Sequence, residues 1–291
     1  MPPNGSRTYP GHMTNRPFRW DLVRPDQVGT LLDDAEKPRL WFLPDLTTCT
    51  AKVLARCGDG ELHFVGRSLD SMHDLLSGAL DHTSWRDRVR RVPLSLKPRR
   101  GFGRRDVRLL RENLAAAGIT PHSLARGTRP TVFVDLVYEG DTFTELYVQL
   151  RDWIDEDREA WHVIRRKLRF LGVTLRQPIR PDAWRWQEDV AWTRELPAAA
   201  VRNVSLARDV WCYFGNDQPK LTPSFPRQRW TDETVRTPDH GKATRRALAE
   251  AFALVDAGRS AAVRDRLVRT ISAEPAIAGP WLRALVTELR G

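Results

Sequence analysis

The sequence predicts an α/β protein in which a parallel sheet is covered by helices on both faces. Over residues 39–176, short apolar stretches alternate with segments whose apolar residues recur at helical spacing. Two of the apolar stretches, 61–65 and 131–134, lead into a glycine-containing turn that is followed by a helix. Because the carboxyl ends of parallel strands meet at one edge of a sheet, we expect both turns at the edge where such folds bind ligands.

Composition and charge are those of a folded, basic protein. Of the 291 residues 41% are hydrophobic, and 47 Lys and Arg against 37 Asp and Glu give a formal charge of +10. This balance suits a polyanionic partner, either a polyphosphate substrate or a nucleic acid, although arginine-rich usage is also what a high-GC genome produces. No apolar run is long enough to span a membrane, and the N-terminus lacks the apolar centre of a secretory signal. We therefore expect a cytoplasmic protein without membrane contact.

Four parts are expected along the chain. They are a flexible arm at 1–18, an α/β domain at 19–176, an irregular Trp-rich hood at 177–231 and a helical region at 232–291. The three cysteines have no C-x-x-C spacing, which argues against a zinc site and suits a reducing compartment.

The α/β domain begins with two predicted strands. Residues 40–43 form an apolar run that predicts a strand, and a helix capped at Thr47 or Thr48 is expected to end at Gly58. The second strand is predicted at 61–65, and a helix through Met72, Leu75, Leu76 and Leu80 is expected after it.

The turn after the second strand has the chemistry of a phosphate site. Gly66 lets the backbone approach a ligand, Arg67 offers a guanidinium fork to phosphate oxygens, and Ser68 adds a hydroxyl at the start of the next helix. The alternative is a solvated helix cap without a ligand.

A basic loop follows the third predicted strand, 89–96. Residues 97–105 hold five cations and two glycines. Cations beside the aromatic Phe102 suit contact with the phosphates of RNA or DNA, and a solvated surface run is the simpler alternative. An amphipathic helix at 106–117 is expected next, ended by Gly118.

The stretch 131–146 is the centre of the predicted domain. Its strand stops at Asp135, the following turn contains Gly140, and Thr142 opens a helix. Unpaired N–H groups at a helix N-terminus and the helix dipole favour an anion there. The alternative is a plain turn in which Gly140 serves only to adopt a positive φ.

This stretch resembles the loop with which type I phosphoribosyltransferases bind 5-phosphoribosyl 1-diphosphate (PRPP). That loop runs as a hydrophobic strand, two acids, two apolar residues, a variable residue and Thr-Gly-x-Thr. Three residues depart from it: Val134 replaces the first acid, Tyr138 stands where some members carry a catalytic carboxylate, and Glu139 puts a negative charge beside a phosphate. The residues that correspond to the family pattern are, in order, Val134, Asp135, Leu136, Val137, Tyr138, Glu139, Gly140, Asp141 and Thr142.

The resemblance covers residues 39–176 and implies a phosphoribosyltransferase-like fold. It implies transfer of a 5-phosphoribosyl group from PRPP to a nucleobase or another small nucleophile, with Mg²⁺ as cofactor and release of pyrophosphate. Asp135 would hold the ribose hydroxyls, the turn 139–142 the 5′-phosphate and the turn 66–68 the pyrophosphate, while the basic loop would close over the substrate. The implied site residues are catalytic Asp135, Arg99 and Arg100 and substrate-binding Gly66, Arg67, Ser68, Lys97, Glu139, Gly140, Asp141, Thr142 and Lys220.

Two other functional classes stay open. A phosphoribosyltransferase-like domain that has lost catalysis would serve as a nucleotide-sensing or RNA-binding regulator, which Val134 and the charge of +10 favour. A phosphatase of the haloacid dehalogenase type also has an acidic loop after a buried strand. Its second acid would be Val137 here, which leaves no general acid.

The last third of the chain predicts a cover and three helices. The hood, 177–231, is too aromatic to be a disordered linker. The resemblance implies that it would hold the acceptor, and Lys220 lies in its polar portion, which is expected to reach the site. Helices are expected at 243–257, 260–272 and 280–290, packed on the main domain or on a second subunit in a homodimer.

Overall fold

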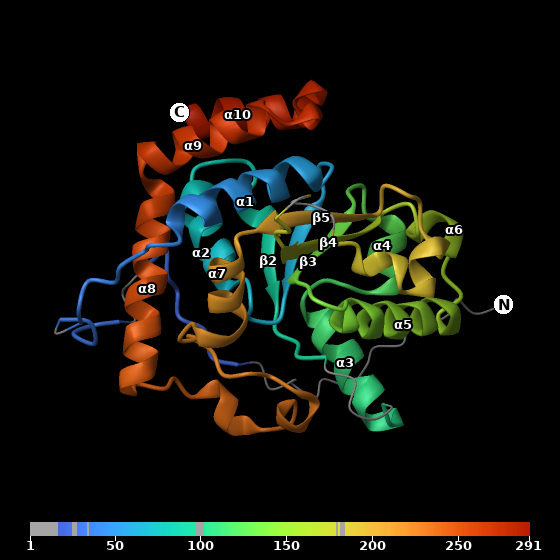
Figure 1. The fold of residues 1–291 in the computed structure, drawn as a ribbon. Helices are drawn as coiled ribbons and strands as arrows, with labels where there is room; N and C mark the ends of the chain where they lie inside the picture. The colour runs from blue at the N-terminus through green and yellow to red at the C-terminus, as the bar shows by residue number, and fades with distance from the viewer. Residues whose placement is uncertain (1–16, 25–27, 34, 97–101, 179, 181–183) are drawn as a thin grey trace.

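Five parallel strands form the centre of the protein (Figure 1). The computed structural model describes residues 17–24, 28–33, 35–96, 102–178, 180 and 184–291. The sheet order is β2-β1-β3-β4-β5, and every neighbouring pair is parallel. The predicted α/β class with a parallel sheet is therefore confirmed. The strands are β1 (Glu61–Val65), β2 (Val89–Val92), β3 (Thr131–Leu136), β4 (Leu168–Leu175) and β5 (Val201–Leu206).

The strand order reverses direction between β1 and β3. The chain passes from β1 outward to β2, then returns to the other side of β1 to form β3, and continues outward through β4 and β5. In open parallel sheets the connections on the two sides of such a reversal diverge, which leaves a crevice at the carboxyl ends of the two strands. The ends of β1 and β3 are therefore the place to look for a ligand site.

One face of the sheet is covered by α1 (Leu43–Arg56), α2 (Asp70–Ala79) and α7 (Arg208–Cys212). Val132 and Val134 of β3 belong to the same buried cluster as apolar residues of these helices. Because side chains alternate between the two faces of a strand, Phe133, which lies between these two valines, points to the opposite side of the sheet.

The helices of the other face are α3 (Arg104–Ala116), α4 (Pro121–Arg126), α5 (Asp141–Glu156) and α6 (Trp161–Ile164). Phe133 packs in the cluster on this side, together with tryptophans from the hood. By alternation Asp135 points to the same side, at the carboxyl end of its strand.

The C-terminal region forms α8 (Lys242–Arg259), α9 (Ala261–Ser272) and α10 (Pro280–Arg290), which confirms the three predicted helices. They pack on the main domain. The axes of α8 and α2 approach so closely that a Cβ on Gly258 would lie 2.2 Å from the carbonyl oxygen of Leu75. Apolar residues of α9 and α10 join the cluster that contains α1 (Figure 1).

Short helical turns complete the chain. They are the 3-10 turns η2 (Arg86–Arg88), η3 (Trp186–Glu188), η4 (Ala191–Glu195), η6 (Arg227–Arg229), η7 (Glu233–Arg236) and η8 (Pro275–Ala278), and the π turn η5 (Tyr213–Asp217). No helix in the described ranges is both long enough and apolar enough to cross a bilayer.

Two predicted strands need correction. The strand at 40–43 is wrong, because Leu43 is the first residue of α1 and Pro44 lies in its first turn, where proline is tolerated. The strand at 89–96 is shorter than predicted. It ends at Val92 because Pro93 has no N–H group to continue the ladder.

The predictions around β4 and β5 also need correction. The apolar spacing over 158–171 also predicts a helix, and this prediction is wrong, since α6 has only four residues and β4 begins at Leu168. The hood, predicted as irregular, contributes β5 to the sheet. The hood is therefore built into the same domain as the strands that carry the candidate site.

Candidate functional site

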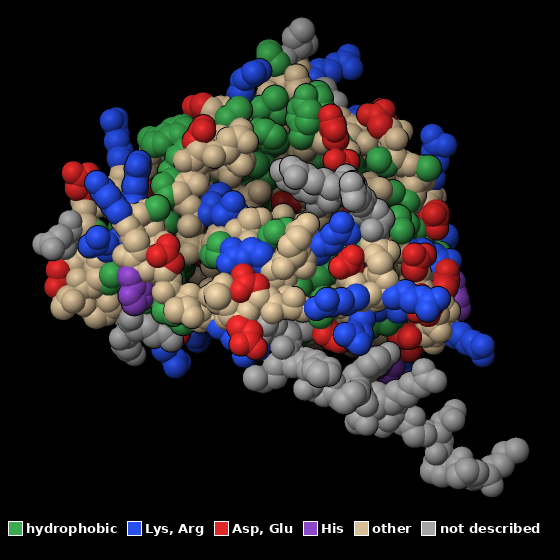
Figure 2. Space-filling model, turned by 90° about the horizontal axis from the view of Figure 1, so that it is seen from below, with side chains coloured by type: hydrophobic (Ala, Val, Ile, Leu, Met, Phe, Trp, Pro, Cys, Tyr) green, Lys and Arg blue, Asp and Glu red, His purple; other side chains and the backbone are tan. Residues whose placement is uncertain are grey.

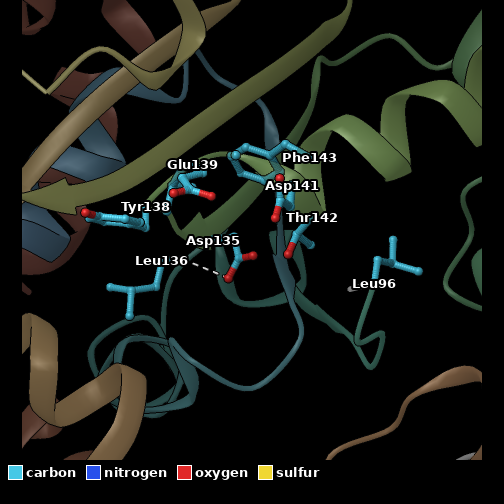
Figure 3. Close-up of a pocket in the computed structure, with 10 residues that line it drawn as sticks. Leu96, Asp135, Leu136, Tyr138, Glu139, Asp141, Thr142 and Phe143 are labelled. Atoms are coloured by element: carbon cyan, nitrogen blue, oxygen red, sulfur yellow. Dashed lines mark hydrogen bonds between the residues drawn. The ribbon is translucent and has the colours of Figure 1, made fainter. Parts of the chain in front are cut away.

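A cavity of about 410 Å³ lies at the carboxyl end of β3. Nine of its ten lining residues are consecutive, 135–143, and run from the end of β3 through the turn into the first residues of α5, while Leu96 lines it from the segment after β2 (Figure 3). Its position at the reversal of the strand order is the one expected for a ligand site. The lining residues are Leu96, Asp135, Leu136, Val137, Tyr138, Glu139, Gly140, Asp141, Thr142 and Phe143.

Asp135 is a buried carboxyl group at the wall of this cavity, with 6% of its surface exposed. Its Oδ1 accepts a hydrogen bond of 2.7 Å from the backbone N–H of Leu136 (Figure 3). Burial raises the pKa of Asp135 to about 7, and hydrogen bonds from Leu136 and from the Thr142 hydroxyl oppose the rise. A carboxyl group in this environment changes charge near neutral pH and can accept hydrogen bonds from ligand hydroxyls.

The turn after Asp135 ends in a helix N-terminus that no side chain caps. Gly140, the N-cap residue of α5, has a φ of +85° in the left-handed region and offers no side chain to the first N–H groups. Thr142, in the first turn of α5, lines the cavity beside Asp135 (Figure 3). Unpaired N–H groups and the helix dipole together favour an anion at this position.

Trp186 of the hood fixes the shape of this turn. A Cβ on Gly140 would lie 2.2 Å from Cε3 of Trp186, so glycine is required both by φ and by the space available. Trp186 Nε1 donates a hydrogen bond of 2.9 Å to Oδ1 of Asn203 in β5. Asn203 Nδ2 in turn donates to the carbonyl oxygen of Trp184 and to Oε1 of Gln187, at 3.0 and 2.8 Å.

Asn203 thus connects β5 to the turn that forms the cavity. Its side chain is 9% exposed and its amide oxygen and nitrogen both have partners in the hood. Sequence reasoning missed Asn203 and Trp186. The available signal was the density of tryptophans near 184–192, but pairing it with Gly140 requires the strand order.

Tyr138 is an exposed aromatic residue at the rim of the cavity, with 50% of its surface accessible. Its ring stacks on the ring of Trp184, with centroids 5.0 Å apart and planes inclined by 22°. Trp184 Nε1 also donates a hydrogen bond of 2.7 Å to the carbonyl oxygen of Tyr138. The position of Tyr138 is therefore held by the hood through both its ring and its backbone.

The turn after β1 lies at the same edge of the sheet, because β1 and β3 are neighbouring parallel strands. Its polar groups, however, bond to the protein itself. The N–H of Gly66 donates to the carbonyl oxygen of Val92 at 2.9 Å, and Arg67 donates to that of Thr222 at 3.0 Å. The carbonyl oxygen of Ser68 lies 3.3 Å from Nζ of Lys220, which donates to it.

Lys220 therefore joins the hood to the turn after β1. Among the described residues, neither Lys220 nor residues 66–68 line the cavity. The side chain of Lys220 also donates to Oε1 of Gln218 at 2.7 Å. Burial lowers the pKa of Lys220 to about 8, with Asp70 opposing and Arg67 adding to the shift.

A buried ionic cluster lies next to the turn that follows β1. Arg91 of β2 pairs with Asp70 and Asp74 of α2, and all three side chains are at most 10% exposed. Burial raises the pKa of Asp74 to about 6, and Arg91 opposes the rise. The opposite charges of the three side chains partly offset the cost of burying each one, and the cluster links β2 to α2.

Two acidic side chains flank the N-terminus of α5 at the cavity. Glu139 and Asp141 are exposed on either side of Gly140. In the described part of the chain no three His, Cys, Asp or Glu side chains converge on one metal position. Glu139 and Asp141 are oxygen donors of the kind that Mg²⁺ accepts, and they could supply only part of its coordination shell. The remaining predicted residues, Lys97, Arg99 and Arg100, lie outside the described residues.

Comparisons of the chain with protein-family models, with curated proteins and with solved structures give no significant match. What the cavity binds is therefore inferred from its own residues.

Proposed function

We propose that the cavity binds a phosphorylated pentose and that the protein is phosphoribosyltransferase-like. It would transfer a 5-phosphoribosyl group from PRPP to a nucleobase or another small nucleophile, with release of pyrophosphate. The observation that carries the proposal is that a buried carboxyl group, Asp135, and the uncapped N-terminus of α5 line one cavity where the strand order reverses.

Each part of PRPP would find a complementary group. The first-turn N–H groups of α5 and the Thr142 hydroxyl would bind the 5′-phosphate, and Asp135 would accept hydrogen bonds from the ribose hydroxyls. The ionised form of Asp135 is the better acceptor, so substrate binding would favour loss of its proton. Mg²⁺ would neutralise the phosphates, which have Glu139 and Asp141 as neighbours.

A second candidate function is a nucleotide-sensing or RNA-binding regulator without catalysis. One observation favours it: the N–H of Gly66 and the guanidinium of Arg67, expected to receive pyrophosphate, already bond to Val92 and Thr222. Val134, in place of the first acid, is fully buried in the apolar core. On the face seen in Figure 2, Lys and Arg side chains are interspersed with Asp and Glu, which gives less support to RNA than to a nucleotide.

Titration calorimetry with PRPP tests the proposal. We expect micromolar affinity in the presence of Mg²⁺ and a loss of at least tenfold, equivalent to ~1.4 kcal/mol, in Asp135→Asn. Asp256→Asn is the matched control, because Asp256 is an exposed carboxylate on α8, away from the cavity. Absence of PRPP binding to the wild type would refute the proposal.

Pyrophosphate release separates the two candidates. An enzyme releases pyrophosphate when PRPP, Mg²⁺ and a panel of nucleobases are supplied, and Asp135→Asn slows the release. A sensor binds PRPP or a nucleotide without turnover. Binding of RNA with a steep dependence on salt, in the absence of PRPP binding, would instead identify the RNA-binding regulator.

A further inference from the structure

We propose that Tyr138 is a platform on which a planar heteroaromatic ring of the ligand stacks, so that the site takes a nucleobase or a nucleotide. This inference rests on the proposed phosphoribosyl site and names the class of group that binds next to it. It assigns a role to Tyr138, which stands at the variable position of the phosphoribosyltransferase pattern, where some members carry a catalytic carboxylate.

The exposure of Tyr138 is unusual in this chain. Among the described residues, the large hydrophobic side chains that are exposed are Trp41, Tyr138 and Val148, and of these Tyr138 is the one that lines the cavity. An exposed aromatic ring at the rim of a cavity offers apolar area and a π-face that a ligand ring can cover. The other aromatic side chain in the lining, Phe143, is fully buried in the core.

The ring of Tyr138 is also held in place before any ligand binds. Trp184 stacks on it at 5.0 Å and is itself fixed through its carbonyl oxygen by Asn203. The ring of Trp211 is tilted by 54° to that of Tyr138 with centroids 6.2 Å apart, and Trp211 Nε1 donates to the carbonyl oxygen of Val173 at 3.1 Å. A ring that is already immobilised loses little conformational entropy when a ligand stacks on it.

The order of groups across the cavity in Figure 3 matches the order of groups in a nucleotide. Gly140 and Thr142 stand at the anion-binding helix terminus, and Asp135 offers a carboxyl group for sugar hydroxyls. In Figure 3 Asp135 lies between Thr142 on one side and Tyr138 on the other, and the side chain of Tyr138 is directed away from Leu96. A base attached at C1 of a ribose extends away from the 5′-phosphate. The aromatic rim of the cavity is the surface with which such a base stacks, and stacking accepts any base because each has a π-face.

Three kinds of probe separate stacking from phosphate binding. Ribose 5-phosphate carries the sugar and the phosphate without a base, the four nucleoside 5′-monophosphates add a base, and the four nucleosides carry a base without phosphate. Calorimetry with each probe is carried out on the wild type, Tyr138→Leu, Tyr138→Phe and Trp41→Leu. Trp41, with 44% exposure, is the matched control for an exposed aromatic ring that does not line the cavity.

We expect at least one monophosphate to bind the wild type about tenfold more tightly than ribose 5-phosphate, equivalent to ~1.4 kcal/mol and within the range of base stacking on an aromatic side chain. Tyr138→Leu should abolish this gain without weakening ribose 5-phosphate, whereas Tyr138→Phe and Trp41→Leu should keep it. Unchanged binding of ribose 5-phosphate to Tyr138→Leu also shows that this variant is folded.

The outcomes distinguish this inference from the proposed function. If ribose 5-phosphate binds and no base adds affinity, or if the gain persists in Tyr138→Leu, the stacking role of Tyr138 is refuted while the phosphoribosyl site stands. If ribose 5-phosphate does not bind but a nucleoside binds in a Tyr138-dependent manner, the phosphoribosyl site fails and the stacking platform stands. If no probe binds, both are refuted.

Discussion

Gly140→Ala adds one carbon atom at a position that the ring of Trp186 already fills. Two costs are expected. A residue other than glycine in the left-handed region costs about 1 kcal/mol or slightly more, and the φ of Gly140 is +85°. The added Cβ would also lie 2.2 Å from Cε3 of Trp186, so the indole must move, and such overpacking costs about 1–3 kcal/mol.

Gly58→Ala separates these two costs. Gly58 has a φ of +66° in the same region, but a Cβ there would meet no atom within 4 Å. We expect Gly58→Ala to lower the free energy of unfolding by about 1 kcal/mol and Gly140→Ala to lower it by about 2–4 kcal/mol, both measured by urea unfolding monitored by circular dichroism.

A double-mutant cycle identifies Trp186 as the cause of the difference. In a Trp186→Leu background the smaller side chain leaves room for the new Cβ, so the additional cost of Gly140→Ala should disappear. Equal costs for Gly140→Ala and Gly58→Ala in the wild-type background would refute the close contact with Trp186. An unchanged cost of Gly140→Ala in the Trp186→Leu background would do the same.

Three further predictions concern the site. Burial raises the pKa of Asp135 to about 7, so between about pH 4 and pH 7 the native protein holds a proton that the unfolded chain releases. As the pH rises through this range, the free energy of unfolding of the wild type should therefore fall relative to that of Asp135→Asn, by up to about 4 kcal/mol. Parallel pH profiles of the two proteins in urea unfolding would contradict this. Asn203→Leu leaves Trp186 Nε1 and the carbonyl oxygen of Trp184 without their hydrogen-bond partner. The free energy of unfolding should therefore drop by about 2–4 kcal/mol in urea unfolding. A change below the error of the measurement would mean that water replaces the amide. Glu139→Thr removes an exposed carboxylate beside the turn and should raise affinity for PRPP about tenfold by calorimetry, whereas unchanged affinity would place the phosphate elsewhere.

Local signals were sufficient for the elements with clear periodicity. The strand at 131–134 and its turn combine an apolar β-branched run with Gly140 and a helical pattern, and the structure has β3 and α5 there. The prediction of a strand at 40–43 is wrong because four apolar residues do not distinguish a strand from the start of a buried helix, and Pro44 favours the helix.

Long-range pairing explains the elements that the sequence pattern missed. Apolar spacing between Trp161 and Leu171 suits a helix, yet residues from Leu168 onward pair with β3 on one side and with β5 on the other. β5 contains Arg202 and Asn203, and these polar residues make it unlike a central strand. Its place at the edge of the sheet allows Arg202 to be exposed.

The same limit applies to the candidate site. Asp135, Gly140 and Thr142 could be found from the sequence because they stand in one turn, and the structure places all three at one cavity. The partner of Gly140, Trp186, could not be found, since its position depends on Asn203 and thus on the pairing of β5 with β4.

The alternation of β3 gives a physical reason for the main departure from the phosphoribosyltransferase pattern. Val134 points to the sheet face that α1 and α2 cover and is fully buried in an apolar cluster, where an unpaired carboxylate would carry a large desolvation cost. Asp135 points to the opposite face, where Thr142 and the N–H of Leu136 bond to its carboxyl group. Of these two neighbouring positions in this chain, the one on the side that opens to the cavity is therefore the one that suits an acid. The remaining carboxyl group then has no second acid beside it, and its charge at neutral pH depends on what occupies the cavity, because a bound cation would favour ionisation and an apolar ring the protonated form.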